Sequence, residues 1–122
     1  MSKPRSRLID YKAKVYREVR GFTTAIHFGR QRKHFAESRG FIPGKSVVTL
    51  DIVTMQRLVS EFAGSGYWIS RQKERVDFKT TIGYSNSEND GESVPTTRGT
   101  IHYSAVGCHV VPFALKTRGK DT

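Results

Sequence analysis

The sequence predicts a single α+β domain in which helices in the N-terminal part pack on an antiparallel β-sheet. The chain has 122 residues, enough for one hydrophobic core and too few for two. Residues 50–64 carry apolar side chains at helical spacing, whereas residues 75–85 and 99–112 alternate with the period of two that is typical of strands. The mixture of one strong helix with separate strand segments indicates the α+β class.

The first 29 residues contain two weaker patterns. The segment SRLIDYKAKVYREVR (6–20) predicts a basic amphipathic helix, with Leu8, Tyr11, Val15 and Val19 on one face. A linker left from a longer polypeptide is the alternative for this segment. The segment GFTTAIHFG (21–29) predicts a strand with Phe22, Thr24, Ile26 and Phe28 on one face and His27 on the other, where His27 is expected to be structural.

The middle of the chain predicts a helix followed by a strand. The apolar stripe in LDIVTMQRLVSEFAG (50–64) consists of Ile52, Met55, Leu58, Val59 and Phe62, and Gly64 is a stop signal. The strand in RVDFKTTIGYS (75–85) directs Val76, Phe78, Thr80, Ile82 and Tyr84 toward the core and leaves Arg75, Asp77, Lys79 and Thr81 on the polar face. The segment SNSENDG (85–91) is a loop by composition.

The C-terminal stretch GTIHYSAVGCHVVP (99–112) predicts a hairpin with polar side chains on one face. A turn at Val106–Gly107, or a four-residue turn at 105–108, pairs Ser104 with His109. His102 then shares their face, diagonal to His109, because side chains two residues apart on a strand point the same way. A three-residue turn would separate these side chains, so the prediction depends on register.

The charge of the chain indicates an anionic partner. Lys and Arg total 21 against 11 Asp and Glu, giving a formal net charge of +10, and nucleic acid is the commonest partner of such a basic domain. Structural ribosomal proteins and polybasic membrane-surface proteins share this charge, and a solvated surface is a further alternative. The only cysteine, Cys108, excludes an intrachain disulfide and a cysteine-rich zinc site. The sequence shows neither a membrane-spanning apolar run nor the apolar core of a signal peptide, so no membrane partner is expected.

Two imidazoles on one sheet face suit metal-independent cleavage of RNA. This reaction needs a base for the ribose 2′-OH, an acid for the leaving 5′-oxygen, and donors that stabilise the charged transition state. Histidine serves the first two roles because it titrates near neutral pH. Surface or packing histidines are the plainer interpretation of His102 and His109, and a histidine metal site is a rival that lacks nearby ligands, since Cys108 should face away from His109.

A third histidine lies in the basic segment GRQRKHFAESRGFIPGKS (29–46). Lys33 precedes His34, and Lys45 and Ser46 in PGKS offer donors to a phosphate group. The segment lacks the upstream glycine spacing of a nucleotide-binding P-loop, so triphosphate binding is rejected. A solvated basic loop is the alternative.

The order of GRQRKH, GKSVV, VDFKTTIGY and PTTRGTIHYSAVGCHVVP resembles the polymorphic toxin type 50 family over residues 25–113. The resemblance implies a metal-independent ribonuclease toxin of the fold shared by barnase, EndoU-type nucleases, nuclease colicins and RelE. The polar positions that match the family's motifs are His34, Ser46, Thr97, His102, Ser104 and His109. Two departures are FAES (35–38) after His34, where the family is expected to have proline and glycine, and Ala105, where relatives often have lysine that contacts phosphate.

The sequence therefore predicts a ribonuclease toxin domain at residues 25–116, preceded by a basic segment (1–24) and followed by a basic tail (117–122). His102 and His109 are expected to be the acid and base, with His34 as an alternative member, and Ser104 and Thr97 complete the catalytic set. The expected substrate-binding residues are Lys33, Lys45, Ser46, Arg98 and Lys79, and neither a metal nor a cofactor is expected.

The resemblance also implies the setting in which the domain works. The domain would be delivered as part of a larger effector of bacterial competition or of a prophage and act as a monomer on RNA, with tRNA as one candidate, in the target-cell cytoplasm. An acidic immunity protein would neutralise it in the cell that makes it. A non-catalytic nucleic-acid-binding module and an inert phage structural fragment are the alternatives; exposed aromatic residues interleaved with basic ones would favour the former.

Overall fold

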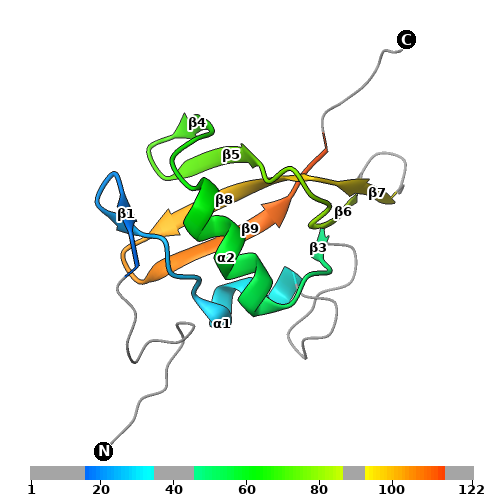
Figure 1. The fold of residues 1–122 in the computed structure, drawn as a ribbon, viewed down its shortest axis with the longest axis horizontal. Helices are drawn as coiled ribbons and strands as arrows, with labels where there is room; N and C mark the ends of the chain where they lie inside the picture. The colour runs from blue at the N-terminus through cyan, green and yellow to red at the C-terminus, as the bar shows by residue number, and fades with distance from the viewer. Residues whose placement is uncertain (1–15, 35–45, 87–92, 115–122) are drawn as a thin grey trace, which may run out of the picture.

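Three antiparallel sheets and two α-helices make up the described parts of the chain, which are residues 16–34, 46–86 and 93–114 of a computed structural model (Figure 1). The four-stranded sheet has the order β4 (Tyr67–Ser70), β5 (Lys73–Asp77), β8 (Arg98–Ser104), β9 (Gly107–Pro112). The three-stranded sheet consists of β3 (Val47–Val48), β6 (Gly83–Asn86) and β7 (Ser93–Thr96), and the smallest pairs β1 (Glu18–Val19) with β2 (Phe22–Thr23). The helices are α1 (Phe28–Gln31), which a 3₁₀ turn η1 (Arg32–His34) follows, and α2 (Ile52–Phe62). The α+β class is thus confirmed, with mostly antiparallel sheets and few helices.

The predicted helix at 50–64 is confirmed as α2, and its limits follow from local sequence. The Asp51 carboxylate accepts a hydrogen bond from the Thr54 backbone N–H at 2.7 Å and caps the first turn. This hydrogen bond is the main reason why the pKa of Asp51 is lowered. Gly64, which has a φ of 94°, follows the last turn, where a side chain would be strained.

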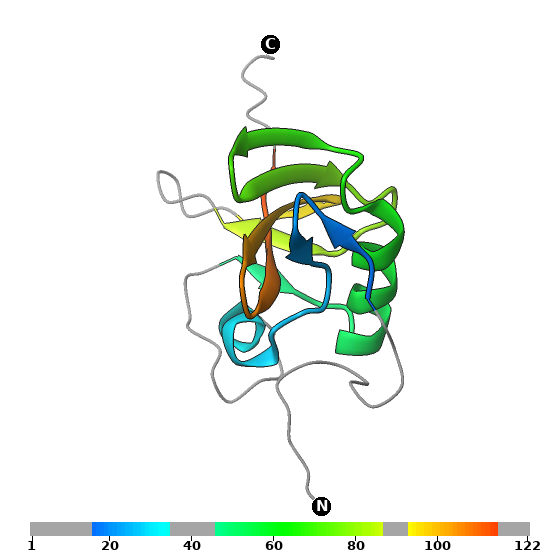
Figure 2. The ribbon, with the colours of Figure 1, turned by 90° about the vertical axis from the view of Figure 1, so that its left-hand side faces the viewer.

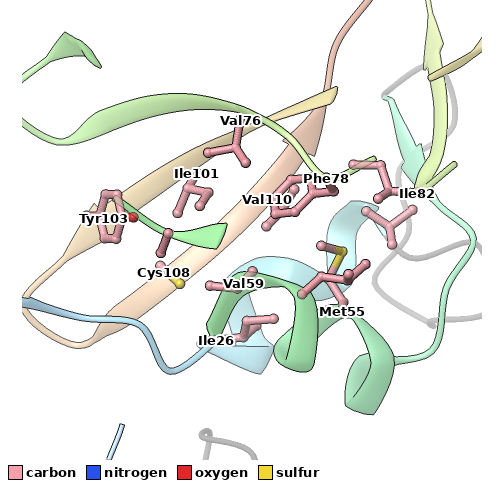
Figure 3. Close-up of a cluster of buried hydrophobic side chains, with 13 residues drawn as sticks. Ile26, Met55, Val59, Val76, Phe78, Ile82, Ile101, Tyr103, Cys108 and Val110 are labelled. Carbon is pink, nitrogen blue, oxygen red and sulfur yellow. The ribbon is translucent and has the colours of Figure 1, made fainter. Parts of the chain in front are cut away.

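The hydrophobic core lies between α2 and one face of the four-stranded sheet (Figure 3). Met55 and Val59 of α2 pack with Ile101 and Val110 of the sheet, and all four are fully buried. Side chains alternate across a sheet, so the residues between these core positions on β8 and β9 lie on the opposite face. The core therefore fixes which face the two hairpin histidines occupy.

Residues 21–29 were expected to form one strand, and that prediction is wrong beyond β2. Thr24, Ala25 and Ile26 are all buried, so their side chains do not alternate as in a half-buried strand. Ile26 forms an isolated parallel bridge with Cys108 at the outer edge of β9. His27 then caps α1, with its Nδ1 accepting a hydrogen bond from the Arg30 N–H at 3.2 Å. A structural role for His27 fits this contact, whereas Phe28, expected in the core, is 41% exposed on α1.

The predicted N-terminal helix is wrong over residues 16–20, which are the part of it that the structure describes. Val19 belongs to β1, which pairs with β2 through a turn at Arg20 and Gly21 in which both residues have positive φ. A helix cannot continue through residues in this conformation. Residues 6–15 of the predicted helix lie outside the described residues. Residues 87–91 of the predicted loop at 85–91 also lie outside them. Ser85 and Asn86 of that loop belong instead to β6.

The predicted strand at 75–85 is interrupted. β5 ends at Asp77, Lys79 adopts a φ of 67°, and β6 begins at Gly83 in a different sheet. Phe78 and Ile82 remain buried as expected, but Tyr84 is 40% exposed. The interruption arises because the Asp77 carboxylate accepts a hydrogen bond from the Lys79 N–H at 2.9 Å and turns the chain.

The hairpin forms with a register that differs by two residues from the expected one. Ser104 pairs with Gly107 across a two-residue turn at Ala105–Val106, and His102 pairs directly with His109. Position 107, the first of β9, requires glycine because a Cβ there would lie 2.9 Å from the Cβ of His27 and 3.0 Å from the Ala25 carbonyl oxygen. A shift of two residues preserves the faces, so the histidines stay together.

Candidate functional site

Three imidazole rings form a row beside β8 and β9. His102 and His109 occupy opposed positions of the hairpin, and their ring centroids lie 4.7 Å apart with an interplanar angle of 19°. The ring of His34 stacks on the other side, 6.1 Å from the His109 centroid and 12° from its plane. We call His34, His109 and His102 the histidine row, with His109 at its centre.

Gln31 fixes the position of α1, and therefore of His34, against β9. Its side chain is fully buried, and its amide nitrogen donates to the Val110 carbonyl at 2.8 Å while its amide oxygen accepts from the Val110 N–H at 2.6 Å. The amide thus pairs with the outer edge of β9 as a further strand would. Figure 2 shows α1 beside β9 at this edge. His34 follows three residues later and brings its ring to His109.

The tautomer of neutral His34 follows from its backbone contact. Its Nδ1 lies 2.9 Å from the Ser46 carbonyl oxygen, and a carbonyl oxygen only accepts, so Nδ1 carries the proton. The lone pair of the neutral ring is then on Nε2. His34 is 6% exposed, whereas His102 and His109 are half-buried. The row therefore has a buried end and two partly accessible members.

The sheet face that carries His102 and His109 is basic, and we call it the histidine face. Strand pairing places Lys73 opposite His102, Arg75 opposite Thr100, and Asp77 opposite Arg98. Lys73 and Arg75 are exposed. Because these positions alternate with the buried Glu74 and Val76, they share the face of the histidines.

One carboxylate accompanies these cations. Asp77 lies 3.6 Å from the Arg98 guanidinium, and its side chain is 34% exposed. Hydrogen bonds from the Lys79 N–H and the Thr97 side chain lower the pKa of Asp77, with a smaller contribution from Arg98. Asp77 is therefore negatively charged at neutral pH and offsets one of the three cations at 73, 75 and 98.

The other two predicted catalytic residues, Ser104 and Thr97, make contacts that stabilise the fold. The Ser104 hydroxyl donates to the Gly107 carbonyl at 2.8 Å and accepts from the Val106 N–H at 3.3 Å, so it closes the turn at the end of the histidine face. Thr97 contacts Asp77 at the opposite end of β8. It lies five residues from His102, or roughly 16 Å along an extended strand. Ser104 is thus near the histidine row and Thr97 is not.

The predicted substrate-binding residues are more dispersed. The Ser46 backbone reaches His34, Lys33 precedes His34 in η1, and Arg98 lies on the histidine face. Lys79 lies in the exposed turn after β5. Lys45 lies outside the described residues.

A shallow hollow on the histidine face involves residues that sequence reasoning missed. It has a volume of about 280 Å³ and is lined by Tyr67, Arg75, Val76, Asp77, Arg98 and Phe113. Tyr67 is 72% exposed, and the Arg75 guanidinium carbon lies 4.7 Å from the centroid of the Phe113 ring. In the sequence, Tyr67 is an aromatic residue shortly after a helix stop, and this position alone does not indicate a binding site. Its proximity to Arg75 depends on the pairing of β4 with β5.

Two further observations concern ligands and membranes. Within residues 16–34, 46–86 and 93–114, no three His, Cys, Asp or Glu side chains are grouped as a metal site. No helix in these same ranges is long and apolar enough to cross a membrane.

The chain matches a known family. The model of the family described as Bacterial toxin 50 matches residues 26–112, a range that includes the whole histidine row and the hollow apart from Phe113. No curated protein matches the chain.

Proposed function

This chain belongs to the bacterial toxin 50 family, and from that premise we propose that it is a metal-independent endoribonuclease that acts as a toxin. The observation that carries the proposal is the histidine row on a basic sheet face. It supports acid–base cleavage of a phosphodiester because two partly accessible imidazoles lie within 4.7 Å of each other. Histidine is the side chain that both takes and gives a proton near neutral pH.

The proposed reaction is transesterification within the RNA chain. One imidazole of the His102–His109 pair takes the proton of a ribose 2′-OH, and the 2′-oxygen attacks the adjacent phosphorus. The bond from phosphorus to the 5′-oxygen breaks, and the second imidazole, as its imidazolium, protonates that oxygen. The products are a 2′,3′-cyclic phosphate and a 5′-hydroxyl, with His34 as an alternative member of the pair.

The surrounding donors are proposed to stabilise the charged phosphorane. Lys73 is opposite His102 in the sheet and is added here to the cations that the sequence indicated, Lys33, Lys45, Lys79 and Arg98. Ser104 is proposed to act through the hairpin turn that it closes, and Ser46 through the carbonyl that orients His34. Thr97 retains a proposed role in substrate positioning through Asp77.

Family membership also suggests a delivered effector and a cognate immunity partner. We propose that the partner is an acidic protein that covers the basic histidine face, because complementary charge accelerates association. We further propose that the domain acts as a monomer in the target-cell cytoplasm, with tRNA as one substrate, and that its fold is that of the barnase, EndoU, colicin and RelE group.

The test is incubation of the purified chain with total RNA in the presence of EDTA. The expected result is cleavage that persists with the chelator and leaves 2′,3′-cyclic phosphate ends. Ends with a 3′-hydroxyl, or cleavage that EDTA abolishes, would contradict the mechanism. An intact RNA pool would contradict the ribonuclease assignment itself.

A non-catalytic nucleic-acid-binding module is the second candidate, and one observation favours it. Tyr67 is a largely exposed aromatic residue whose pairing partner on the next strand is Arg75. Exposed aromatic residues beside cations are typical of surfaces that stack nucleic-acid bases. RNA binding without any cleavage would support this alternative.

A further inference from the structure

We propose that the hollow lined by Tyr67, Arg75 and Arg98 binds one nucleotide of single-stranded RNA next to the phosphate held at the histidine row. The proposal rests on the proposed function for the position of that phosphate. The recognition itself depends only on the chemistry of the hollow: a base would stack on the Tyr67 ring, and a backbone phosphate would contact the two guanidinium groups.

The hollow and the histidines belong to successive rows of one sheet face. Lys73, His102 and His109 form one row, and Tyr67, Arg75 and Thr100 form the next. Two such rows are separated by two residues along a strand, or about 7 Å, and β4, which carries Tyr67, lies two strands from β8, or about 10 Å across the sheet. An RNA strand that passes the histidines therefore meets the Tyr67 row without leaving the face.

The side chains of the hollow are arranged for a planar, anionic ligand. Tyr67 is 72% exposed at the edge strand β4, so its ring is accessible to a second planar group. The Arg75 guanidinium lies over the Phe113 ring, at 4.7 Å from its centroid, and this contact restricts where the cation can move. A held guanidinium loses less conformational entropy when it binds a phosphate.

The charge balance of the hollow favours an anionic ligand over a neutral or basic one. Arg75 and Arg98 contribute two positive charges, and Asp77 offsets one of them through its 3.6 Å contact with Arg98. The remaining charge is that of Arg75, which strand pairing places opposite Tyr67. One cation beside one exposed ring matches the phosphate and base of one nucleotide.

The test measures binding and cleavage separately. Binding uses a labelled single-stranded 2′-O-methyl oligonucleotide, which lacks the nucleophilic 2′-OH and cannot be cleaved by the proposed route. Tyr67→Ala is expected to raise the Kd by about 5- to 100-fold, the range for loss of one stacked base, and Tyr67→Phe should retain near wild-type Kd. The matched control is Tyr84→Ala, which removes a 40% exposed tyrosine from the other sheet and should change Kd less than twofold.

The kinetic measurement uses the unmodified oligonucleotide. Tyr67→Ala and Arg75→Ala should raise KM and leave kcat within a few fold, because a flanking contact is made equally in the ground and transition states. Equal Kd values for Tyr67→Ala and Tyr84→Ala would overturn the proposal. If the wild-type chain cleaves no RNA but Tyr67→Ala still weakens binding relative to Tyr84→Ala, the ribonuclease function fails while the nucleotide site stands.

Discussion

His109 is the ring that contacts both other members of the histidine row. If it transfers a proton, His109→Ala should lower kcat for RNA cleavage by about 10²- to 10⁴-fold. His102→Ala should lower kcat by a similar factor. A loss of this size in His34→Ala would support the alternative in which His34 is a member of the acid–base pair. The free energy of unfolding should change little for His102→Ala and His109→Ala, because both side chains are half-buried on the face opposite the core.

Kinetics with chemical denaturation of the same samples would separate catalysis from stability. Folded His102→Ala and His109→Ala variants that cleave RNA at the wild-type rate would exclude both residues from the reaction. Variants that unfold would show instead that the rings stabilise the hairpin. In that case, His→Asn substitutions, which keep a polar planar group, would test the chemistry again.

Glu74 is a fully buried carboxylate whose role is structural. Its oxygens accept hydrogen bonds from the N–H groups of Gly64 and Gly66 and from the Tyr103 hydroxyl, at 2.6–3.0 Å. Burial is the largest cause that raises the pKa of the Tyr103 hydroxyl, and the hydrogen bond with Glu74 and the charge of Glu74 raise it further. This hydroxyl therefore keeps its proton and remains a donor. The carboxylate thereby joins β5 and β8 to the loop that follows α2.

Glu74→Ala should therefore lower the free energy of unfolding by about 3 kcal/mol, because it leaves the buried Tyr103 hydroxyl and two part-buried N–H groups without their acceptor. Glu61→Ala, on the exposed side of α2, should change it by less than about 0.5 kcal/mol. Urea denaturation of both variants checks the difference. Similar values for the two variants would show that water replaces the Glu74 contacts.

At the level of elements, the histidine row depends on how α1 docks on β9. The two hydrogen bonds between Gln31 and Val110 are the contacts that fix this docking. Gln31→Ala should lower the free energy of unfolding by about 2 kcal/mol. Because His34 follows in η1, the substitution should also change the imidazole nitrogen shifts of His34 in NMR spectra, which report its tautomer.

Gln72→Ala provides the control for Gln31→Ala. Gln72 is exposed and donates to the Tyr103 carbonyl on the β5 side of β8, across the sheet from the edge of β9 that α1 contacts, so its loss should leave the His34 spectrum unchanged. Gln31→Glu keeps the shape but places an oxygen against the Val110 carbonyl, and it should resemble Gln31→Ala. A wild-type His34 spectrum in Gln31→Ala would mean that Ser46 alone orients the ring.

The elements differ in how far the sequence could predict them. α2 was predictable because its cap, apolar stripe and stop all lie between Asp51 and Gly64. The hairpin faces were predictable from alternation, but the register was not. Gly107 is required by the approach of residues 25–27, a contact between segments about 80 residues apart, whereas sequence rules assign such a glycine to the turn itself.

The parts of the site that sequence patterns missed are likewise non-local. Gln31 is a polar residue in a basic segment, and only its pairing with β9 explains why it is buried. The interruption of the strand at Lys79 involves a positive φ in a residue other than glycine, which carries no sequence signal. The position of Tyr67 beside Arg75 follows from the pairing of β4, a strand that the patterns did not predict.

At the scale of the whole molecule, the net charge of +10 is expected to dominate RNA binding through release of counterions. Charge alone does not say which side of the molecule the RNA contacts. The structure offers two sides for comparison, because Lys73 and Arg75 lie on the histidine face while Arg57 lies on the exposed side of α2, which packs against the opposite face of the sheet.

Salt dependence can distinguish these two sides. Binding of the 2′-O-methyl oligonucleotide should weaken linearly in log Kd against log salt, and each lost phosphate contact should reduce the slope by about 0.7. Lys73→Ala should therefore give a shallower slope than the wild type, because Lys73 is opposite His102 in the row where the phosphate is proposed to lie. Arg57→Ala removes the same charge from the α2 side and should leave the slope unchanged.

A reduced slope for Arg57→Ala with a wild-type slope for Lys73→Ala would place the RNA on the helix side and separate it from the histidines. Equal reductions would indicate binding by net charge without a preferred face, since a long-range field does not depend on which side a cation occupies.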